Sequence, residues 1–141
     1  MEKQKELENM LTEERASWSE KISKIIPDLT KEEKLIDLSV ISLSYREQIV
    51  DIMCKYRNLL RKISQKLDKD KAERMVWHIT HNQLKIRNNE MLENFVRNDI
   101  ADISGQQQLV KDQLVFFQEQ LATLNSLQFS IKLAKEIFSE Q

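Results

Sequence analysis

The chain of 141 residues has a hydrophobic fraction of 40% and a formal net charge of −1. This length allows one domain with a moderate core and is too short for two independent ones. Because the chain has one Gly and one Pro, it lacks the turn residues that a β-sandwich or an α/β fold needs, and the composition predicts an all-α bundle of long helices.

Apolar residues at helical steps predict a first helix over residues 4–26, which Pro27 ends. Thr30 followed by Glu33 has the spacing of a capping box, so a second helix is expected to start there. Residues 1–30 are therefore interpreted as an N-terminal helical extension.

The apolar pattern of the second helix continues to Leu67, and the polar stretch 68–71 predicts a bend. A third helix is expected over residues 85–103, before Ser104-Gly105 loosens the chain. The last helix is expected over residues 106–139. We divide the chain into residues 1–30, the helical region 31–105 and the C-terminal helix 106–141, within one cooperative domain.

The last helix carries apolar residues at alternating steps of four and three, which is typical of a coiled-coil seam. We expect copies of the chain to associate through this seam, although the rest of the same chain could cover it instead. The predicted interface residues are Val110, Leu114, Phe117, Leu121, Leu124, Leu127, Ile131 and Phe138.

Charge is strongly segregated along the chain. Residues 1–54 carry 8 Lys/Arg and 12 Asp/Glu, residues 55–87 carry 10 and 3, and residues 88–141 carry 4 and 8, so the net charges are −4, +7 and −4. A basic segment of this kind favours a polyanion such as nucleic acid. The predicted DNA-binding residues are Lys62, Lys66, Lys69, Lys71, Arg74, Trp77, Lys85 and Arg87. Trp77 beside basic residues is typical of single-stranded nucleic-acid binding, in which bases stack on aromatic rings, although the ring could instead belong to the core.

No catalytic or cofactor motif is present, so we expect a binding protein and not an enzyme. His78 and His81 lack carboxylates at metal-ligand spacing, and no metal site is predicted. Cys54 is the only cysteine, which excludes an intramolecular disulfide and fits a reducing compartment. The chain has no apolar run near the roughly 20 residues that span a bilayer and does not open with a signal peptide, so a cytoplasmic protein without membrane contact is expected.

The C-terminal half is similar to a known family. The likeness is carried by Glu90-Met91, Asp99, Phe117, Leu124-Asn125-Ser126, Phe129-Ser130-Ile131-Lys132 and Phe138. In these residues the chain resembles the UvsY-type recombination mediators of T4-like phages, which end in an Asn or Ser, a Phe-x-Ile-Lys element and an aromatic residue. Upstream, residues 71–78 resemble the basic helix of that family, with Trp77 and His78 at its paired tyrosine positions and Thr80 in place of its usual Gly.

The resemblance implies a protein that binds single-stranded DNA without sequence preference and assembles into a homo-oligomer, a ring of six or seven copies. It also implies loading of a RecA-like recombinase onto DNA covered by the phage single-strand-binding protein. By position, Lys71 and Arg74 would contact DNA, and the helix from Val110 to Phe138 would join the copies. Two alternatives stay open: a scaffold or adaptor protein whose basic face binds an acidic protein, and a protein of the membrane surface.

Overall fold

The computed structural model describes residues 2–81 and 88–140. Its elements in chain order are α1 (Glu2–Ser23), the short 3-10 helices η1 (Ile26–Thr30) and η2 (Glu32–Lys34), α2 (Leu35–His81), α3 (Asn89–Asp99) and α4 (Ala101–Ser139). No strand occurs within the two described ranges. The all-α prediction is therefore confirmed.

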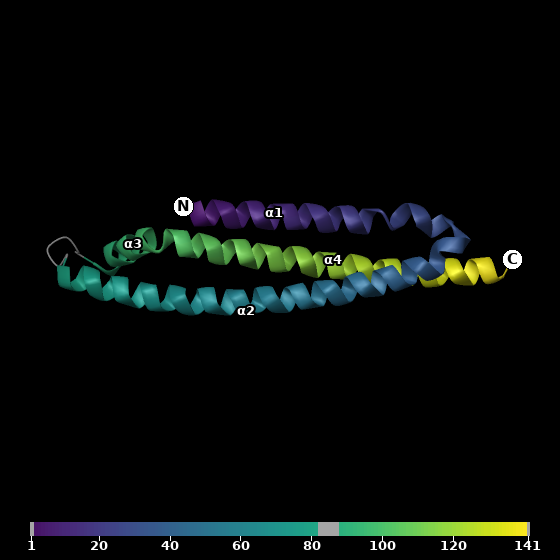
Figure 1. Cartoon of the computed structure of the whole chain (residues 1–141). Helices are drawn as coiled ribbons and strands as arrows, with labels where there is room; N and C mark the ends of the chain where they lie inside the picture. Colours follow the sequence, from purple (N-terminus) through teal and green to yellow (C-terminus); the bar gives the residue numbers. More distant parts are fainter. Residues whose placement is uncertain (1, 82–87, 141) are drawn as a thin grey trace.

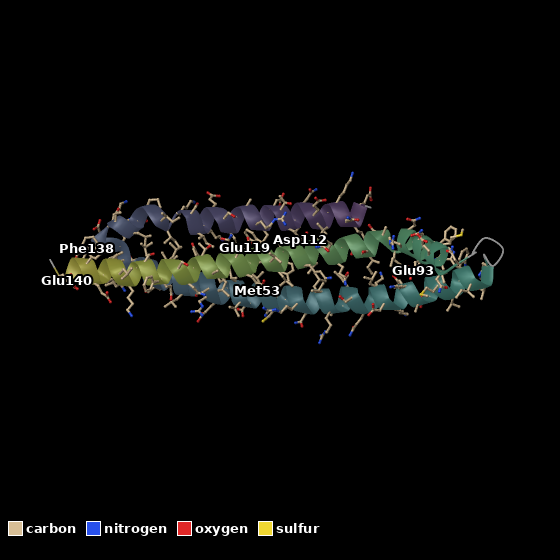
Figure 2. The ribbon with its side chains drawn as sticks, turned by 180° about the vertical axis from the view of Figure 1, so that it is seen from behind. Met53, Glu93, Asp112, Glu119, Phe138 and Glu140 are labelled. Carbon is tan, nitrogen blue, oxygen red and sulfur yellow. The ribbon has the colours of Figure 1, made fainter. Side chains whose placement is uncertain are left out.

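The three long helices lie side by side, with α4 drawn between α1 and α2 (Figure 1). α2 has 47 residues, so at about 1.5 Å per residue it is about 70 Å long. α3 packs beside the C-terminal end of α2, and α1 covers only part of the length of the bundle. Met53, which is 3% exposed, lies on α2 where this helix runs beside α4 (Figure 2).

Aromatic rings from three helices meet in the core around α4. Phe117 and Leu124 of α4 and Ile49 of α2 have 0% exposure. The Phe117 ring stacks on Tyr56 of α2 with a centroid distance of 6.0 Å, and Trp18 of α1 meets Phe117 edge-on at 6.4 Å. Complete burial of a large apolar side chain stabilises the fold by about 1.5–3 kcal/mol, so these rings anchor α1 and α2 to α4.

A polar network crosses the same core. Gln113 of α4 is 0% exposed, and its Nε2 donates to the backbone O of Leu11 and to Glu14 Oε1, each at 3.1 Å. The Tyr56 hydroxyl donates to the same Glu14 oxygen at 2.5 Å, and Arg15 Nη1 donates to Gln113 Oε1 at 3.3 Å. Burial raises the pKa of Tyr56 well above its ordinary 10.0, and the hydrogen bond and charge of Glu14 raise it further. These directional bonds fix where α1 lies along α2 and α4.

The connection between α1 and α2 differs from its prediction. α1 ends at Ser23, and the predicted capping box at Thr30 and Glu33 is wrong: Thr30 Oγ1 donates to the backbone O of Pro27 at 3.3 Å, and no side chain caps η2. Two 3-10 turns fill this stretch because Pro27 occupies the first turn of η1, where its missing N–H is tolerated.

Two predicted helix boundaries are wrong. α2 runs unbroken through residues 68–71, because Asp and Lys without Gly or Pro do not interrupt a helix. The chain turns at Ile100, and Gly105 lies inside α4. A Cβ added to Gly105 would lie 2.5 Å from Nε2 at the flexible end of Gln4, so the Gln4 side chain of α1 packs against the α4 backbone at this glycine, which does not end a helix.

The first 30 residues belong to the core of the molecule. In this stretch Leu11, Trp18, Ile22 and Ile25 are at most 5% exposed. α1 packs along α4, and η1 contacts both α2 and α4. The stretch that the sequence marked as an extension is therefore the third layer of the bundle.

The eight residues predicted to join copies of the chain are covered within the chain itself. Leu121 and Phe138 are partly buried against the core. The other six are at most 8% exposed: Val110, Leu114, Phe117, Leu124, Leu127 and Ile131. Copies could meet through these side chains only if the bundle opened. The seam spacing identifies the buried face of α4, but α1 and α2 are the helices that cover it.

Replacement of Tyr56 by Phe tests the polar network. We expect Tyr56→Phe to lower the free energy of unfolding by about 1–2 kcal/mol, because Glu14 loses a partly buried hydrogen-bond donor. Tyr45→Phe is the matched control, since no hydrogen bond of the Tyr45 hydroxyl is found among the described residues, and its effect should stay below about 0.5 kcal/mol. Urea denaturation at pH 7 measures both.

The same pair of proteins tests the raised pKa of Tyr56. Above the ordinary pKa of 10.0, Tyr56 ionises in the unfolded chain before it ionises in the folded one, so wild-type stability falls as pH rises. The stability difference between wild type and Tyr56→Phe should therefore narrow above pH 10. A difference that is constant up to pH 11 contradicts this assignment.

Candidate nucleic-acid interface

Four lysines form a row along α2. Lys55, Lys62 and Lys69 recur at steps of seven residues, close to two helical turns, and Lys66 lies one turn after Lys62. All four are exposed. The row from Lys55 to Lys69 is about 21 Å long at 1.5 Å per residue. We call these four residues the lysine row.

The lysine row is almost free of neutralising carboxylates. Among the ion pairs between described residues, one includes the row: Lys69 Nζ and Glu73 Oε1 are 3.9 Å apart, with both side chains exposed. Such an exposed pair contributes little. Lys62 and Lys66 are like charges one turn apart, an arrangement that slightly destabilises a helix. Lys55, Lys62 and Lys66 are therefore a line of positive charge with no ion-pair partner among the described residues.

The other predicted DNA-binding residues of α2 are not all on this side. Lys71 follows Lys62 by nine residues, two and a half turns, and so lies on the opposite side of the helix. Arg57 precedes Lys71 by fourteen residues, close to four turns, and so lies on about the same side as Lys71, and Arg61 also lies away from the lysine row. Charge counting along the chain located these cations but could not assign their directions. The remaining two predicted residues, Lys85 and Arg87, lie outside the described residues.

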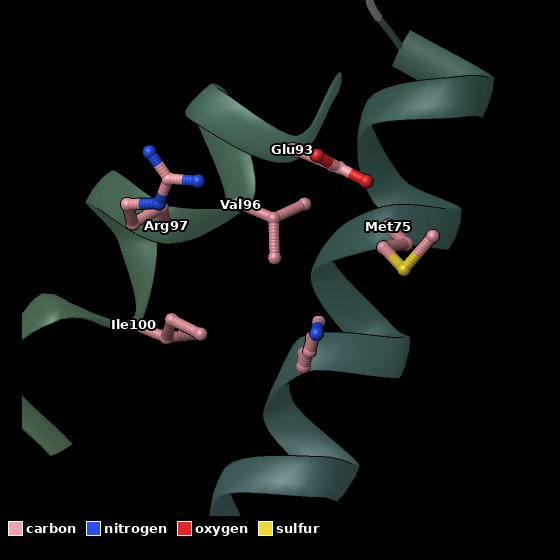
Figure 3. A pocket seen from close by; sticks show the side chains of 6 residues that line it. Met75, Glu93, Val96, Arg97 and Ile100 are labelled. Atoms are coloured by element: carbon pink, nitrogen blue, oxygen red, sulfur yellow. The ribbon is translucent and has the colours of Figure 1, made fainter. Parts of the chain in front are cut away.

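Lys71 lines a pocket between α2 and α3 (Figure 3). Met75 of α2 and Val96 of α3 supply apolar walls, and Glu93 and Arg97 of α3 add one charge of each sign. No sequence pattern selects Arg97, because it is an isolated cation in an acidic segment. Because Glu93 opposes the two cations, the pocket is not a purely cationic site.

Arg74 is held by an acid of α3. Arg74 Nε donates to Asp99 Oδ2 at 2.9 Å, and His78 Nε2 lies 2.6 Å from the same oxygen. Partial burial acts to raise the pKa of Asp99, but the hydrogen bonds and charges of His78 and Arg74 outweigh it and hold that pKa below its ordinary value. Arg74 is therefore used inside the chain, joining α2 to α3, and is not a free cation for phosphate.

Trp77 lies on the same side of α2 as the lysine row, three turns after Lys66. It is 39% exposed. The Arg74 guanidinium lies 4.4 Å from the centre of the indole, and the His81 ring stacks on the indole at 4.8 Å. A base could therefore stack on Trp77 only if Arg74 or His81 moved away.

The partners of the two histidines include aromatic rings and, for His78, the Asp99 carboxylate. His78 is 5% exposed and stacks on Phe95 of α3 at 5.3 Å, besides its bond to Asp99. Within residues 2–81 and 88–140, no three His, Cys, Asp or Glu side chains are grouped so that they could hold a metal ion. In the same ranges, no helix has the length and apolar character needed to cross a membrane.

Replacement of Asp99 by Asn tests the junction of α2 and α3. We expect Asp99→Asn to weaken this junction, because Arg74 and His78 lose the carboxylate charge with which they pair. The expected loss is about 1 kcal/mol, a modest value because that carboxylate is partly exposed. Faster hydrogen exchange of the α3 amides would report it. Glu93→Gln, which removes an exposed carboxylate that has no ion pair among the described residues, is the control and should leave exchange unchanged.

The pKa of Asp99 gives this prediction a pH dependence. The stabilising contribution is present above the ordinary pKa of 3.8 and is lost as pH falls below it, through the lower pKa of the folded state. The exchange difference between wild type and Asp99→Asn should therefore disappear in acid. Equal exchange at neutral pH would show that Asp99 does not hold α3.

Comparisons of the chain with models of protein families, with curated proteins and with solved structures find no match. The function is therefore argued from the lysine row and its surroundings.

Proposed function

We propose that the protein is a phage recombination mediator. It binds single-stranded DNA without sequence preference as a homo-oligomer and promotes loading of a RecA-like recombinase onto DNA covered by single-strand-binding protein. The observation that carries the DNA-binding part is the lysine row, in which Lys55, Lys62 and Lys66 have no carboxylate partner among the described residues. The recombinase and the single-strand-binding protein enter through the resemblance of residues 90–138 to UvsY-type mediators.

The row supports backbone binding more than base recognition. Lysine is a point charge on a flexible stem, and lysine contacts to phosphate carry no sequence information. A straight row on a helix of 47 residues also differs from the short recognition helix that enters a duplex groove. Trp77 at the end of the row adds one ring on which a base could stack after Arg74 or His81 moves.

The strength of binding depends on the number of copies. One row offers about four phosphate contacts, so a single chain would bind weakly and lose affinity steeply with salt. Joined copies raise the effective concentration of the second and later rows, and the assembly then holds a strand firmly. A strand held extended in this way is a better substrate for recombinase nucleation, and holding it requires no chemical step.

The alternative is a helical scaffold or adaptor protein whose basic face binds an acidic protein. The pairing of Arg74 with Asp99 and the covered ring of Trp77 favour it, because both reduce the features that would select nucleic acid. Binding to oligo-dT separates the two proposals. A scaffold that recognises an acidic protein surface is not expected to bind oligo-dT with an affinity that falls regularly as salt concentration rises.

The direct test is fluorescence anisotropy with labelled oligo-dT. At about 50 mM salt the wild type should bind, and Lys62→Ala with Lys66→Ala should weaken binding about tenfold or more. The slope of log affinity against log salt should fall in magnitude by about 1.4, since each contact to a single strand contributes about 0.7. No binding by the wild type would reject the mediator proposal.

Two double variants are matched controls with the same change of charge. Arg57→Ala with Arg61→Ala removes cations from another side of α2 and should have a much smaller effect. Lys71→Ala with Arg74→Ala removes the two residues that would contact DNA according to the family resemblance. If either control weakens binding as much as the lysine-row variant does, the row is not the site.

A further inference from the structure

The N-terminal half of α2 exposes a second line of apolar residues. Its members recur at steps of four, three and seven, the spacing of a coiled-coil seam. They are Ile36 (71% exposed), Val40 (62%), Leu43 (48%) and Val50 (42%). The buried residues of the same helix, such as Leu38 and Ile49, lie on another side and pack inside the bundle. We call the four exposed residues the apolar stripe.

The apolar stripe needs an explanation because single exposed apolar residues are common on proteins but aligned ones are not. A contiguous exposed apolar surface usually marks an interaction site. Here a shallow pocket lies at the C-terminal half of the stripe, lined by Leu43 and Val50 together with Arg46, Glu47 and Asp51. An apolar floor with charges of both signs at its edge is the usual composition of a helix–helix contact.

We infer that the apolar stripe is a contact between two copies of this chain, with their α2 helices parallel and in register. The charges beside the stripe select this partner and this orientation. Arg46 lies on one flank, and Asp37 and Asp51 lie on the other. In a parallel pair, a residue on the first flank faces the residue five positions later on the second flank of the other helix. Arg46 of each copy thus faces Asp51 of the other.

An antiparallel pair would be less favourable. It brings like flanks together, so that the aspartates of one copy face those of the other and Arg46 gains no acidic partner. Glu47 occupies a seam position between Leu43 and Val50. In the parallel pair the two Glu47 carboxylates lie at the same level and repel each other, which lowers stability, and Arg46 of the second copy lies next to each of them; a polar residue in a seam also fixes register.

The stripe also has a defined end. Continuing the same steps, the next seam positions are Cys54, Arg57 and Arg61. Two copies would repel each other at the arginines, so the contact stops near Cys54. The lysine row lies about a quarter turn or more around α2 from the stripe, so pairing leaves it open, and the two rows run in the same direction. This contact rests on the homo-oligomer part of the proposed function. It joins the copies through α2, whereas the sequence predicted that they join through the C-terminal helix.

Mass in solution tests the contact without DNA. At about 100 μM the wild type should sediment at twice the 16.8 kDa of one chain, whereas Leu43→Asp should weaken association about a hundredfold or more and give monomers, because a carboxylate would be desolvated in the seam of both copies. Phe129→Asp is the matched control: Phe129 is a 64% exposed apolar residue of α4 and should not change the mass.

Glu47→Leu is the complementary variant, since it removes the charge from the seam. It should tighten association about tenfold or more, a gain that misfolding cannot produce. A wild type that is monomeric at 100 μM, or a Leu43→Asp variant that associates as well as the wild type, overturns the inference. So does loss of association in Phe129→Asp alone.

Cys54 reports the orientation. It is exposed and is the only cysteine, and in a parallel pair in register the two Cys54 residues lie at the same level. Diamide, which accepts two electrons and two protons from two thiols, should therefore give a covalent dimer that is absent in Cys54→Ser and strongly reduced in Leu43→Asp. In an antiparallel pair centred on Glu47 the two cysteines would be about 21 Å apart, too far for a disulfide.

A wild type that is dimeric by mass but forms no covalent dimer overturns the parallel arrangement. The outcomes of the mass and cross-linking measurements are independent of DNA binding. If oligo-dT does not bind, the mediator proposal fails while the pairing stands. If pairing fails while oligo-dT still binds through Lys62 and Lys66, only the contact is lost.

Discussion

The fold depends on the burial of one side of α4 between α1 and α2. Phe117 is the centre of this contact, since rings from both neighbouring helices meet it and it retains no exposed surface. Gln113 fixes the alignment of α1 in an otherwise apolar interface, because its hydrogen bonds to Leu11 and Glu14 can form in one alignment of α1 only. With its inner side committed to α4, α2 is left with a long outer surface, and both the lysine row and the apolar stripe lie there.

Much of this fold could be predicted from spacing alone. The all-α class, the long second helix and the buried face of α4 follow from apolar residues at helical steps and from the scarcity of Gly and Pro. The occupant of a buried face does not follow from spacing, because a seam looks the same whether the same chain or another copy covers it. Trp18 and Ile22, in what the sequence marked as an extension, are part of that cover. Gly105 likewise has its partner, Gln4, a hundred residues away.

The candidate site was predictable in composition and not in geometry. The surplus of cations in residues 55–87 is evident from the sequence, and the step of seven from Lys55 to Lys69 can be read there too. The pairing of Arg74 with Asp99 cannot, since 25 residues separate them and nothing local links them. Tertiary contact thus divides the basic segment into cations that hold the chain together and cations that face outward, a distinction that a count of charges does not make.

The two ends of the bundle differ in the number of helices that pack together, because α1 covers only part of its length. Because α1 begins beside Gly105, the part of α2 that carries Lys69 and Trp77 extends past it, and among the described residues its neighbours there are α3 and the first turns of α4. Segments with fewer buried neighbours separate at lower free energy than the rest of a protein. This end of α2 is therefore expected to open at lower free energy than the three-layered remainder of the bundle.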